Sequence, residues 1–353
     1  MTALRPLSAH ELEGIIDRRG VCVTVYTETG PRADLDDAIH AASLLLRDEQ
    51  DDATRTAVLD GLRDVSGDIR AHVPGGAAIF ATPTEVRTVP LQGLPTAPDA
   101  GARVQTADRF FVAPLLADLD SRIPVMVLAL SQNAVRLVDA DVEPPRIVPV
   151  PGLPQDLRSF DALDLTNDRE TLSHLRTSEE PTIRQRQYIH AIDEALAEVV
   201  DAETLLVVAA AEPLAGLFGE LSRHPRLAHP GLVGNADEQT PDELAVAAVA
   251  AVARERAAVR DRELARLAEF PDRDLVADEP AVVLAAGRLG AIDTLFVDLD
   301  RSDEVDAVED VARAAHEGGA RIVIAAPTAA LPGHRPAAAI LRYPVDADQV
   351  EVG

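Results

Sequence analysis

A short window in the second half of the chain contains the residue types that bind phosphate. Residues 182–192 include arginine, glutamine and histidine but no aspartate or glutamate. Elsewhere acids dominate, because 60 acidic residues outnumber 33 basic ones and the formal net charge is −27. Arginine forks and helix N-termini both attract phosphate groups, so the pattern predicts local contacts with RNA. The predicted RNA contacts are Arg184, Gln185, Arg186 and Gln187.

The same window also has a purely structural interpretation. Thr182 precedes Gln185 by three residues, which is the spacing of a helix capping box. In that case Gln185 caps the start of a helix, and the two arginines only face solvent. The sequence leaves both interpretations open.

Six side chains near residue 300 have the spacing of a calcium-binding loop. They occupy positions 1, 3, 5, 7, 9 and 12 of that pattern: Asp298, Asp300, Ser302, Glu304, Asp306 and Glu309. The sixth position is Asp303 instead of glycine, and a strand is expected before the run. Acids in the first turn of a helix also stabilise it through the helix dipole. We therefore favour a solvated helix start over a metal site.

Other familiar chemical motifs are absent from the sequence. It has no glycine-rich dinucleotide or P-loop motif, no His-Glu-x-x-His, no Cys-x-x-Cys and no Gly-x-Ser-x-Gly. His224 and His229 lie in the segment Arg-His-Pro-Arg-Leu-Ala-His-Pro-Gly, which we interpret as a surface loop held by two prolines. We predict no cofactor and no metal, and the catalytic residues, if any, stay unknown.

Composition limits the class of protein. A chain of 353 residues fits two or three domains, and 47% hydrophobic with 26% charged residues is typical of a folded protein. The single cysteine, Cys22, cannot form an internal disulfide, which indicates an intracellular protein. Neither a signal peptide nor an apolar run of about 18–20 residues is present, so we expect a cytoplasmic protein without a membrane partner.

Hydrophobic periodicity predicts an α/β protein. The C-terminal third alternates helix and strand, and a long helix is expected over 241–270, beginning at Thr240-Pro241-Asp242-Glu243. Its mixed charges indicate a structural, solvated face. Residues 92–107 are expected to form a loop, and 152–181 a long polar one. The main predicted strands are 21–27, 77–81, 86–91, 125–130, 134–139, 146–150, 205–210, 292–297 and 321–325.

Three groups of segments, taken in order, resemble a known family: the bacterial homologues of archaeo-eukaryotic peptide release factors, which are relatives of eukaryotic class I release factor and pelota. The first group comprises ADRFFVAPLL at 107–116 and VMVLALSQNAVRLVDAD at 125–141. The second comprises RQYIHAIDEALAEV at 186–199 and LLVVAAAEPLAGLF at 205–218. The third comprises AVVLAAGRLGAIDTLFVD at 281–298, GGARIVIAAPTAALPG at 318–333 and AAILRY at 338–343.

The resemblance implies three domains. They are an N-terminal α/β domain (1–120), a ribonuclease H-like middle domain (121–240) and an L7Ae-like α/β C-terminal domain (241–353). In the release factors a loop of the middle domain has a Gly-Gly-Gln tripeptide, whose glutamine helps water attack the peptidyl-tRNA ester. The equivalent loop here, 152–183, contains only Gly152 and Gln155, and Pro154 between them fixes φ.

The resemblance therefore predicts a ribosome-associated translation factor homologue, acting in rescue, stalling or hibernation and not as a hydrolase. Its partner would be the ribosome, at sites that bind rRNA and tRNA. Two alternatives stay open. One is a hydrolase of peptidyl-tRNA or another ester with a non-standard loop around Gln155. The other is an adaptor whose acidic surface binds a basic protein partner.

Overall fold

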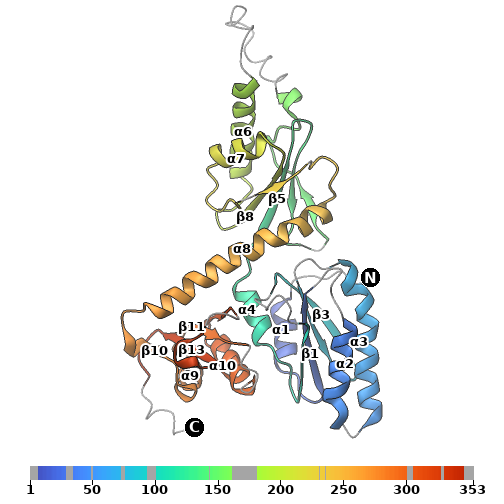
Figure 1. Cartoon of the computed structure of the whole chain (residues 1–353), viewed down its shortest axis with the longest axis vertical. Coiled ribbons are helices and arrows are strands. Elements are labelled where there is room, and N and C mark those ends of the chain that lie inside the picture. The colour runs from blue at the N-terminus through green and yellow to red at the C-terminus, as the bar shows by residue number, and fades with distance from the viewer. Residues whose placement is uncertain are drawn as a thin grey trace, which may run out of the picture. The chain divides into compact units, whose positions relative to one another are not determined.

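The structure is a computed structural model of the chain (Figure 1). It describes residues 7–28, 35–48, 51–72, 76–93, 101–142, 144–160, 181–229, 231–234, 236–299, 305–326 and 330–345. They form two compact units: 123–255, and the described residues before 123 together with those after 255. The described residues contain three sheets flanked by helices, which confirms the predicted α/β class. The predicted domain boundaries at 120/121 and 240/241 stay a prediction.

The first sheet is antiparallel, in the order β3-β2-β1-β4. Its strands are β1 (Cys22–Glu28), β2 (Gly76–Ala81), β3 (Val86–Leu91) and β4 (Arg103–Ala107). The accompanying helices are α1 (Ala9–Ile16), α2 (Leu35–Leu45), the short 3₁₀ helix η1 (Leu46–Asp48), α3 (Asp52–His72) and α4 (Ala113–Asp120). β4 corrects the expected loop over 92–107, because its backbone pairs with the edge of β1 although the strand has few apolar side chains.

Alternation along β1 gives this sheet two faces. Val23 and Val25 pack with the apolar residues of α2 and α3. Figure 1 shows these two helices on one face of the sheet. Cys22 and Tyr26 point to the opposite face, where they share a core with α4 and with the C-terminal sheet. The first and third sheets therefore belong to one compact unit.

The middle sheet lies in the other unit and has the order β7-β6-β5-β8-β9. Its strands are β5 (Val125–Leu130), β6 (Val135–Asp139), β7 (Arg146–Val148), β8 (Leu205–Ala210) and β9 (Leu232–Val233). β5, β6 and β7 pair antiparallel, whereas β8 pairs parallel with β5 and β9 parallel with β8. An antiparallel meander extended by parallel strands is the ribonuclease H-like arrangement that the resemblance implies.

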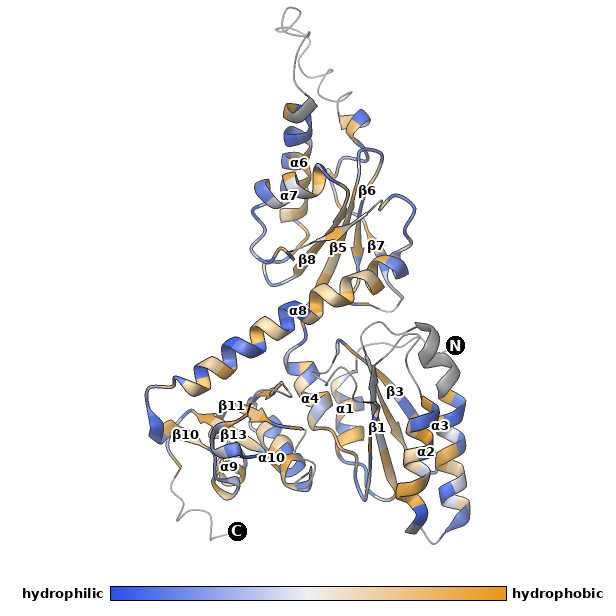
Figure 2. Cartoon of the chain, in the orientation of Figure 1, coloured by the Kyte–Doolittle hydropathy of each residue, from blue (hydrophilic) through white to orange (hydrophobic). Residues whose placement is uncertain are grey.

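Helices cover both faces of the middle sheet (Figure 1). α6 (Pro181–Ala197) and α7 (Leu214–Leu221) pack on one face, and the first half of α8 (Pro241–Ala268) packs on the other. Figure 2 shows that hydrophobic residues concentrate in the strands, while hydrophilic and hydrophobic residues alternate along α8. Thr240 and Glu243 form the predicted capping box at the start of α8, with Thr240 N–H donating to the Glu243 carboxylate at 2.8 Å.

The C-terminal sheet is mixed, in the order β10-β13-β11-β12, with β11 and β12 parallel. Its strands are β10 (Val276–Ala277), β11 (Ile292–Val297), β12 (Arg321–Ile324) and β13 (Ala337–Leu341). The helices of this part are α9 (Pro280–Arg288), α10 (Val305–Glu317) and the 3₁₀ helices η2 (Arg273–Leu275) and η4 (Pro332–His334). In the described part of the chain, no helix has the length and apolar composition required to cross a bilayer.

A buried charge network connects α10 with α4. The Glu309 carboxylate accepts the backbone N–H groups of Val112 at 2.9 Å and Ala113 at 3.0 Å, at the start of α4. Arg313 donates to Glu309 and, at 2.6 Å, to the carbonyl oxygen of Phe110. Burial raises the pKa of Glu309, and Arg313 counteracts that shift. Glu309 is therefore neither a calcium ligand nor a solvated residue at a helix start, which corrects the sequence expectation at this position.

Candidate functional site

The candidate site lies at the end of the β5–β6 hairpin. The turn between the two strands is fixed by Ser131, whose hydroxyl oxygen accepts the N–H groups of Asn133 at 2.9 Å and Ala134 at 3.0 Å. The N–H of Ser131 in turn donates to the carbonyl oxygen of Ala134 at 2.9 Å. This serine turn closes the hairpin tightly and gives the neighbouring segments a rigid support.

Residues 152–160, the described start of the predicted loop, fold back onto this turn. The N–H of Val135 donates to the carbonyl oxygen of Gln155 at 3.0 Å, and the N–H of Leu157 donates to that of Gln132 at 3.0 Å. Gly152 adopts φ +76°, which lets the chain reverse after β7. The Gln155 side chain is exposed while its backbone is held. Residues 161–180, the rest of the predicted loop, lie outside the described residues.

A helical turn begins at residue 157 and prepares the approach to α6. The Asp156 carboxylate accepts the N–H of Ser159 at 2.6 Å, and hydrogen bonds of this kind lower the pKa of Asp156. Phe160, in the same turn, lies 5.8 Å from the Tyr188 ring, measured between ring centroids. Tyr188 is fully buried, and its hydroxyl donates to the carbonyl oxygen of Ser131 at 3.1 Å. Hairpin, turn and α6 are thus joined through one tyrosine.

The four predicted RNA contacts all lie in the N-terminal half of α6, but their environments differ. Arg184 and Gln187 are exposed, and Gln185 is half-buried. Arg186 forms an ion pair with Glu220 of α7, at 3.0 Å between nitrogen and oxygen. Three- and four-residue spacing accounts for the difference, because residues 184 and 187 share the outward face of the helix. The capping role predicted for Thr182 concerns a side chain outside the described ones.

We define the α6 patch as Arg158, Arg184, Gln187 and His190, all of which are exposed. Arg158 belongs to the helical turn that packs on α6 through Phe160, and the other three residues belong to α6 itself. The patch combines two guanidinium groups with an amide and an imidazole, a set that suits phosphate and base edges. Sequence reasoning missed Arg158 and His190, although the acid-free run 182–192 already included His190.

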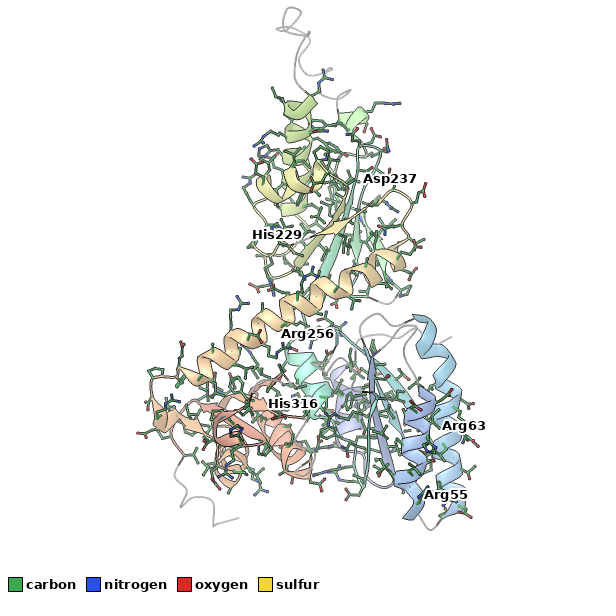
Figure 3. The ribbon with its side chains drawn as sticks, in the orientation of Figure 1. Arg55, Arg63, His229, Asp237, Arg256 and His316 are labelled. Carbon is green, nitrogen blue, oxygen red and sulfur yellow. The ribbon has the colours of Figure 1, made fainter. Side chains whose placement is uncertain are left out.

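Among the residues that the structure describes, no three or more histidine, cysteine, aspartate or glutamate side chains lie together in a way that could hold a metal ion. His224 instead hydrogen-bonds the carbonyl oxygen of Thr204 through Nε2, at 2.7 Å. His229, labelled in Figure 3, lies in the same loop. Of the six side chains with calcium-loop spacing, Asp300, Ser302 and Glu304 lie outside the described residues.

Comparison with known families gives a match over the middle unit. Residues 124–257 match the model of the bacterial archaeo-eukaryotic release factor family 11, which confirms the resemblance drawn from the sequence. The matched segment nearly coincides with the compact unit 123–255, although the two boundaries come from independent observations. No protein of curated function matches this sequence.

The long but distant matches among solved structures include the following three translation factors. Archaeal translation termination factor aRF1 is 16% identical, with 95% of this chain and 97% of that chain covered and a TM-score of 0.24. Archaeal Pelota, in a model of its ribosome-bound complex with ABCE1, is 13% identical, with coverage of 98% and 96% and a TM-score of 0.43. Archaeoglobus fulgidus Pelota is 14% identical, with coverage of 97% and 95% and a TM-score of 0.39.

Proposed function

We propose that this chain is a ribosome-associated translation factor homologue of the release factor and pelota type. One observation carries the proposal: the segment that matches the release factor family, 124–257, is also a compact unit with ribonuclease H-like topology. A family match that follows the borders of a folded unit indicates a whole domain of that family and not a shared short motif. The proposed place of action is the ribosomal A site, in the cytoplasm.

The proposed contact surface is the α6 patch. A chain of net charge −27 is repelled by rRNA over most of its surface, so attraction has to come from a few local groups. Arg158 and Arg184 supply such groups next to the hairpin end, and Gln187 adds a hydrogen-bonding amide. Because few phosphate contacts are involved, we expect binding at low salt that weakens as salt is raised.

The proposal places the chain in rescue, stalling or hibernation and not in peptide release. The segment that corresponds to the catalytic loop has Pro154 next to Gln155, and the Gln155 carbonyl oxygen is bonded to Val135 N–H. A glycine pair would give the backbone freedom at this point, whereas Pro154 and the backbone hydrogen bond from Val135 to Gln155 restrict it. Neither feature supports a glutamine that moves close to an ester.

Cosedimentation with ribosomes tests the proposal. The full-length chain, incubated at low salt with ribosomes from exponential and stationary cells, should pellet with them in at least one growth phase. Arg184→Glu and Arg158→Glu together should reduce the pelleted fraction by about tenfold, since two phosphate contacts become repulsive. Arg146→Glu is the matched control, because Arg146 is an exposed arginine of the same unit at the opposite end of the hairpin.

Three results would contradict the proposal. One is a chain that pellets with ribosomes in no growth phase. Another is hydrolysis of peptidyl-tRNA that disappears in Gln155→Ala, which would establish the ester hydrolase instead. The third is a partner captured in a pull-down that survives ribonuclease treatment, without ribosomes, which would establish the adaptor.

A further inference from the structure

A cavity opens in the middle unit where the parallel strands end. β5, β8 and β9 run in the same direction and finish at Leu130, Ala210 and Val233. After Leu130 the chain turns into the β5–β6 hairpin, whereas after Ala210 it leads into α7, so the two connections diverge. A cavity of about 290 Å³ lies at this point. In open α/β sheets, divergence at the carboxyl ends of neighbouring strands is where ligands bind.

The polar lining is held in place by the surrounding backbone. Asp237, labelled in Figure 3, accepts a hydrogen bond from the Asn133 side-chain amide at 3.0 Å. Hydrogen bonds from Ser131 and Asn133 lower the pKa of Asp237, so its carboxylate is ionised at neutral pH. Arg136 fastens the segment that contains Asp237 by donating to the carbonyl oxygens of Ala236 at 2.7 Å and Gln239 at 3.0 Å.

A second acidic residue, Glu212, lines the same cavity. Glu212 precedes α7 and is exposed, and its Oε2 accepts the N–H of Gly216 at 3.3 Å. Ser131, Gln132 and Asn133 complete the polar lining. No arginine or histidine is among the described residues that line it. The cavity therefore repels phosphates and carboxylates and favours groups that donate hydrogen bonds.

The remaining lining is apolar. Leu130 and Leu214 are buried and contribute walls, and Ala236 adds a third buried surface. Ala211 and Pro213 are exposed and form part of the mouth beside Glu212. A ligand that matches this lining has a short aliphatic stem, which contacts the leucines, and a cationic end, which meets the carboxylates. Arginine and lysine side chains have this design, and guanidinium also matches carboxylates as a planar fork.

We propose that this cavity binds the guanidinium or ammonium end of a short aliphatic chain, with Asp237 and Glu212 as the anionic partners. Two sources supply such a group: a basic side chain of a peptide, and a small free amine such as agmatine. The inference concerns the isolated chain, so it stands or falls independently of ribosome binding.

Isothermal titration of the full-length chain tests the inference. The probes are N-acetyl-arginine methylamide, agmatine and N-acetyl-citrulline methylamide, which is the neutral isostere of the first. The arginine derivative should bind one site, the citrulline derivative should bind about tenfold more weakly or not at all, and raised salt should weaken the cationic probe. Agmatine binding as tightly as the arginine derivative identifies a small amine as a sufficient ligand, whereas agmatine binding more weakly identifies a basic peptide.

Variants connect binding to the two carboxylates. Glu212→Gln and Asp237→Asn should each weaken the arginine derivative by about tenfold, because each removes one charge from the cavity. Asp237→Asn also removes a carboxylate that holds the turn. Glu212 is exposed, and Glu212→Gln keeps one oxygen that can accept the Gly216 N–H, so Glu212→Gln tests binding without a folding defect. Glu198→Gln, an exposed acid elsewhere in the same unit, is the matched control. Absence of saturable binding, equal affinity for citrulline and arginine derivatives, or unchanged affinity in Glu212→Gln overturns the inference.

Discussion

The same residue types have opposite roles in two regions of this molecule. Between α4 and α10, Arg313 and Glu309 have side chains that are 9% and 3% exposed and are bonded to each other and to backbone groups. At the hairpin end, Arg186 is 41% exposed and pairs with a more exposed glutamate, and Arg184 faces solvent. A buried arginine is committed to structure by the cost of leaving it unpaired, whereas an exposed one can exchange water for a ligand.

The carboxylates of the two regions differ in the same way. Asp118 of α4 is completely buried and bonded at 2.6 Å to Arg256 of α8, which is labelled in Figure 3. Burial raises the pKa of Asp118, although Arg256 opposes the shift. Asp237 is bonded by neutral donors at a cavity, and those bonds lower its pKa. Asp118 is therefore a structural residue, whereas Asp237, which lines a cavity, is ionised and can interact with a ligand.

The largest expected effect comes from breaking the buried network. Glu309→Ala leaves Arg313 buried with its charge unpaired and removes the acceptor for two backbone N–H groups of α4. We expect the free energy of unfolding to fall by about 3–5 kcal/mol, measured by urea denaturation followed by circular dichroism. Glu317→Ala, an exposed acid at the end of the same helix, is the control. A loss no larger than that of the control would show that the network does not hold α4.

The pH dependence of stability should separate the two aspartates. The folded-state pKa of Asp118 is raised above 3.8, so its contribution to stability is present at low pH and is lost as pH rises through the raised value. The folded-state pKa of Asp237 is lowered, so its contribution is present above about 3.8 and is lost as pH falls. Relative to wild type, Asp118→Asn should therefore become more stable as pH rises through the raised pKa of Asp118, and Asp237→Asn should become more stable as pH falls through the lowered pKa of Asp237. The free energy of unfolding of each variant relative to wild type is measured by urea denaturation across the pH range that spans both pKa values. If it changes with pH in the same direction for both variants, the distinction between the two aspartates is refuted.

A smaller effect is expected where α6 joins the hairpin. Tyr188→Phe keeps the buried ring but removes the hydroxyl that donates to the Ser131 carbonyl oxygen. Loss of one such hydrogen bond should lower the free energy of unfolding of the middle unit by about 1 kcal/mol. Tyr343→Phe provides the comparison, because the Tyr343 hydroxyl donates to Leu289 at an exposed position. If both variants are equally stable, the tyrosine does not anchor α6.

The smallest effect is expected for the ion pair between α6 and α7. Arg186→Ala removes a contact whose two side chains are 41% and 61% exposed, so solvent already screens it. The free energy of unfolding, measured by thermal denaturation, should change by no more than about 0.5 kcal/mol. A larger loss would mean that Arg186 is structural like Arg313, and it would remove the contrast between the two regions.

Local patterns in the sequence were sufficient for most of the elements near the candidate site. Alternating apolar residues and the Ser-Gln-Asn turn predicted the β5–β6 hairpin. The Thr-Pro-Asp-Glu motif predicted where α8 begins, and its predicted end lies two residues beyond the observed one. β4 was missed because a strand at the edge of a sheet needs only backbone partners. The α6 window was predicted as a unit, but the sequence could not tell that Arg186 meets Glu220 from a helix that lies more than thirty residues later.

The sequence by itself determined the class of fold, the resemblance to release factors and the local charge of α6, because these depend on periodicity, segment order and neighbours along the chain. Only the tertiary structure decided which charges are structural. Glu309 has the spacing of a metal ligand, yet two backbone N–H groups at the start of α4 donate to its carboxylate. Glu212 follows β8 and Asp237 follows β9, and the pairing of these parallel strands brings the two carboxylates to one cavity. Burial and convergence depend on contacts between distant segments, which no local pattern contains.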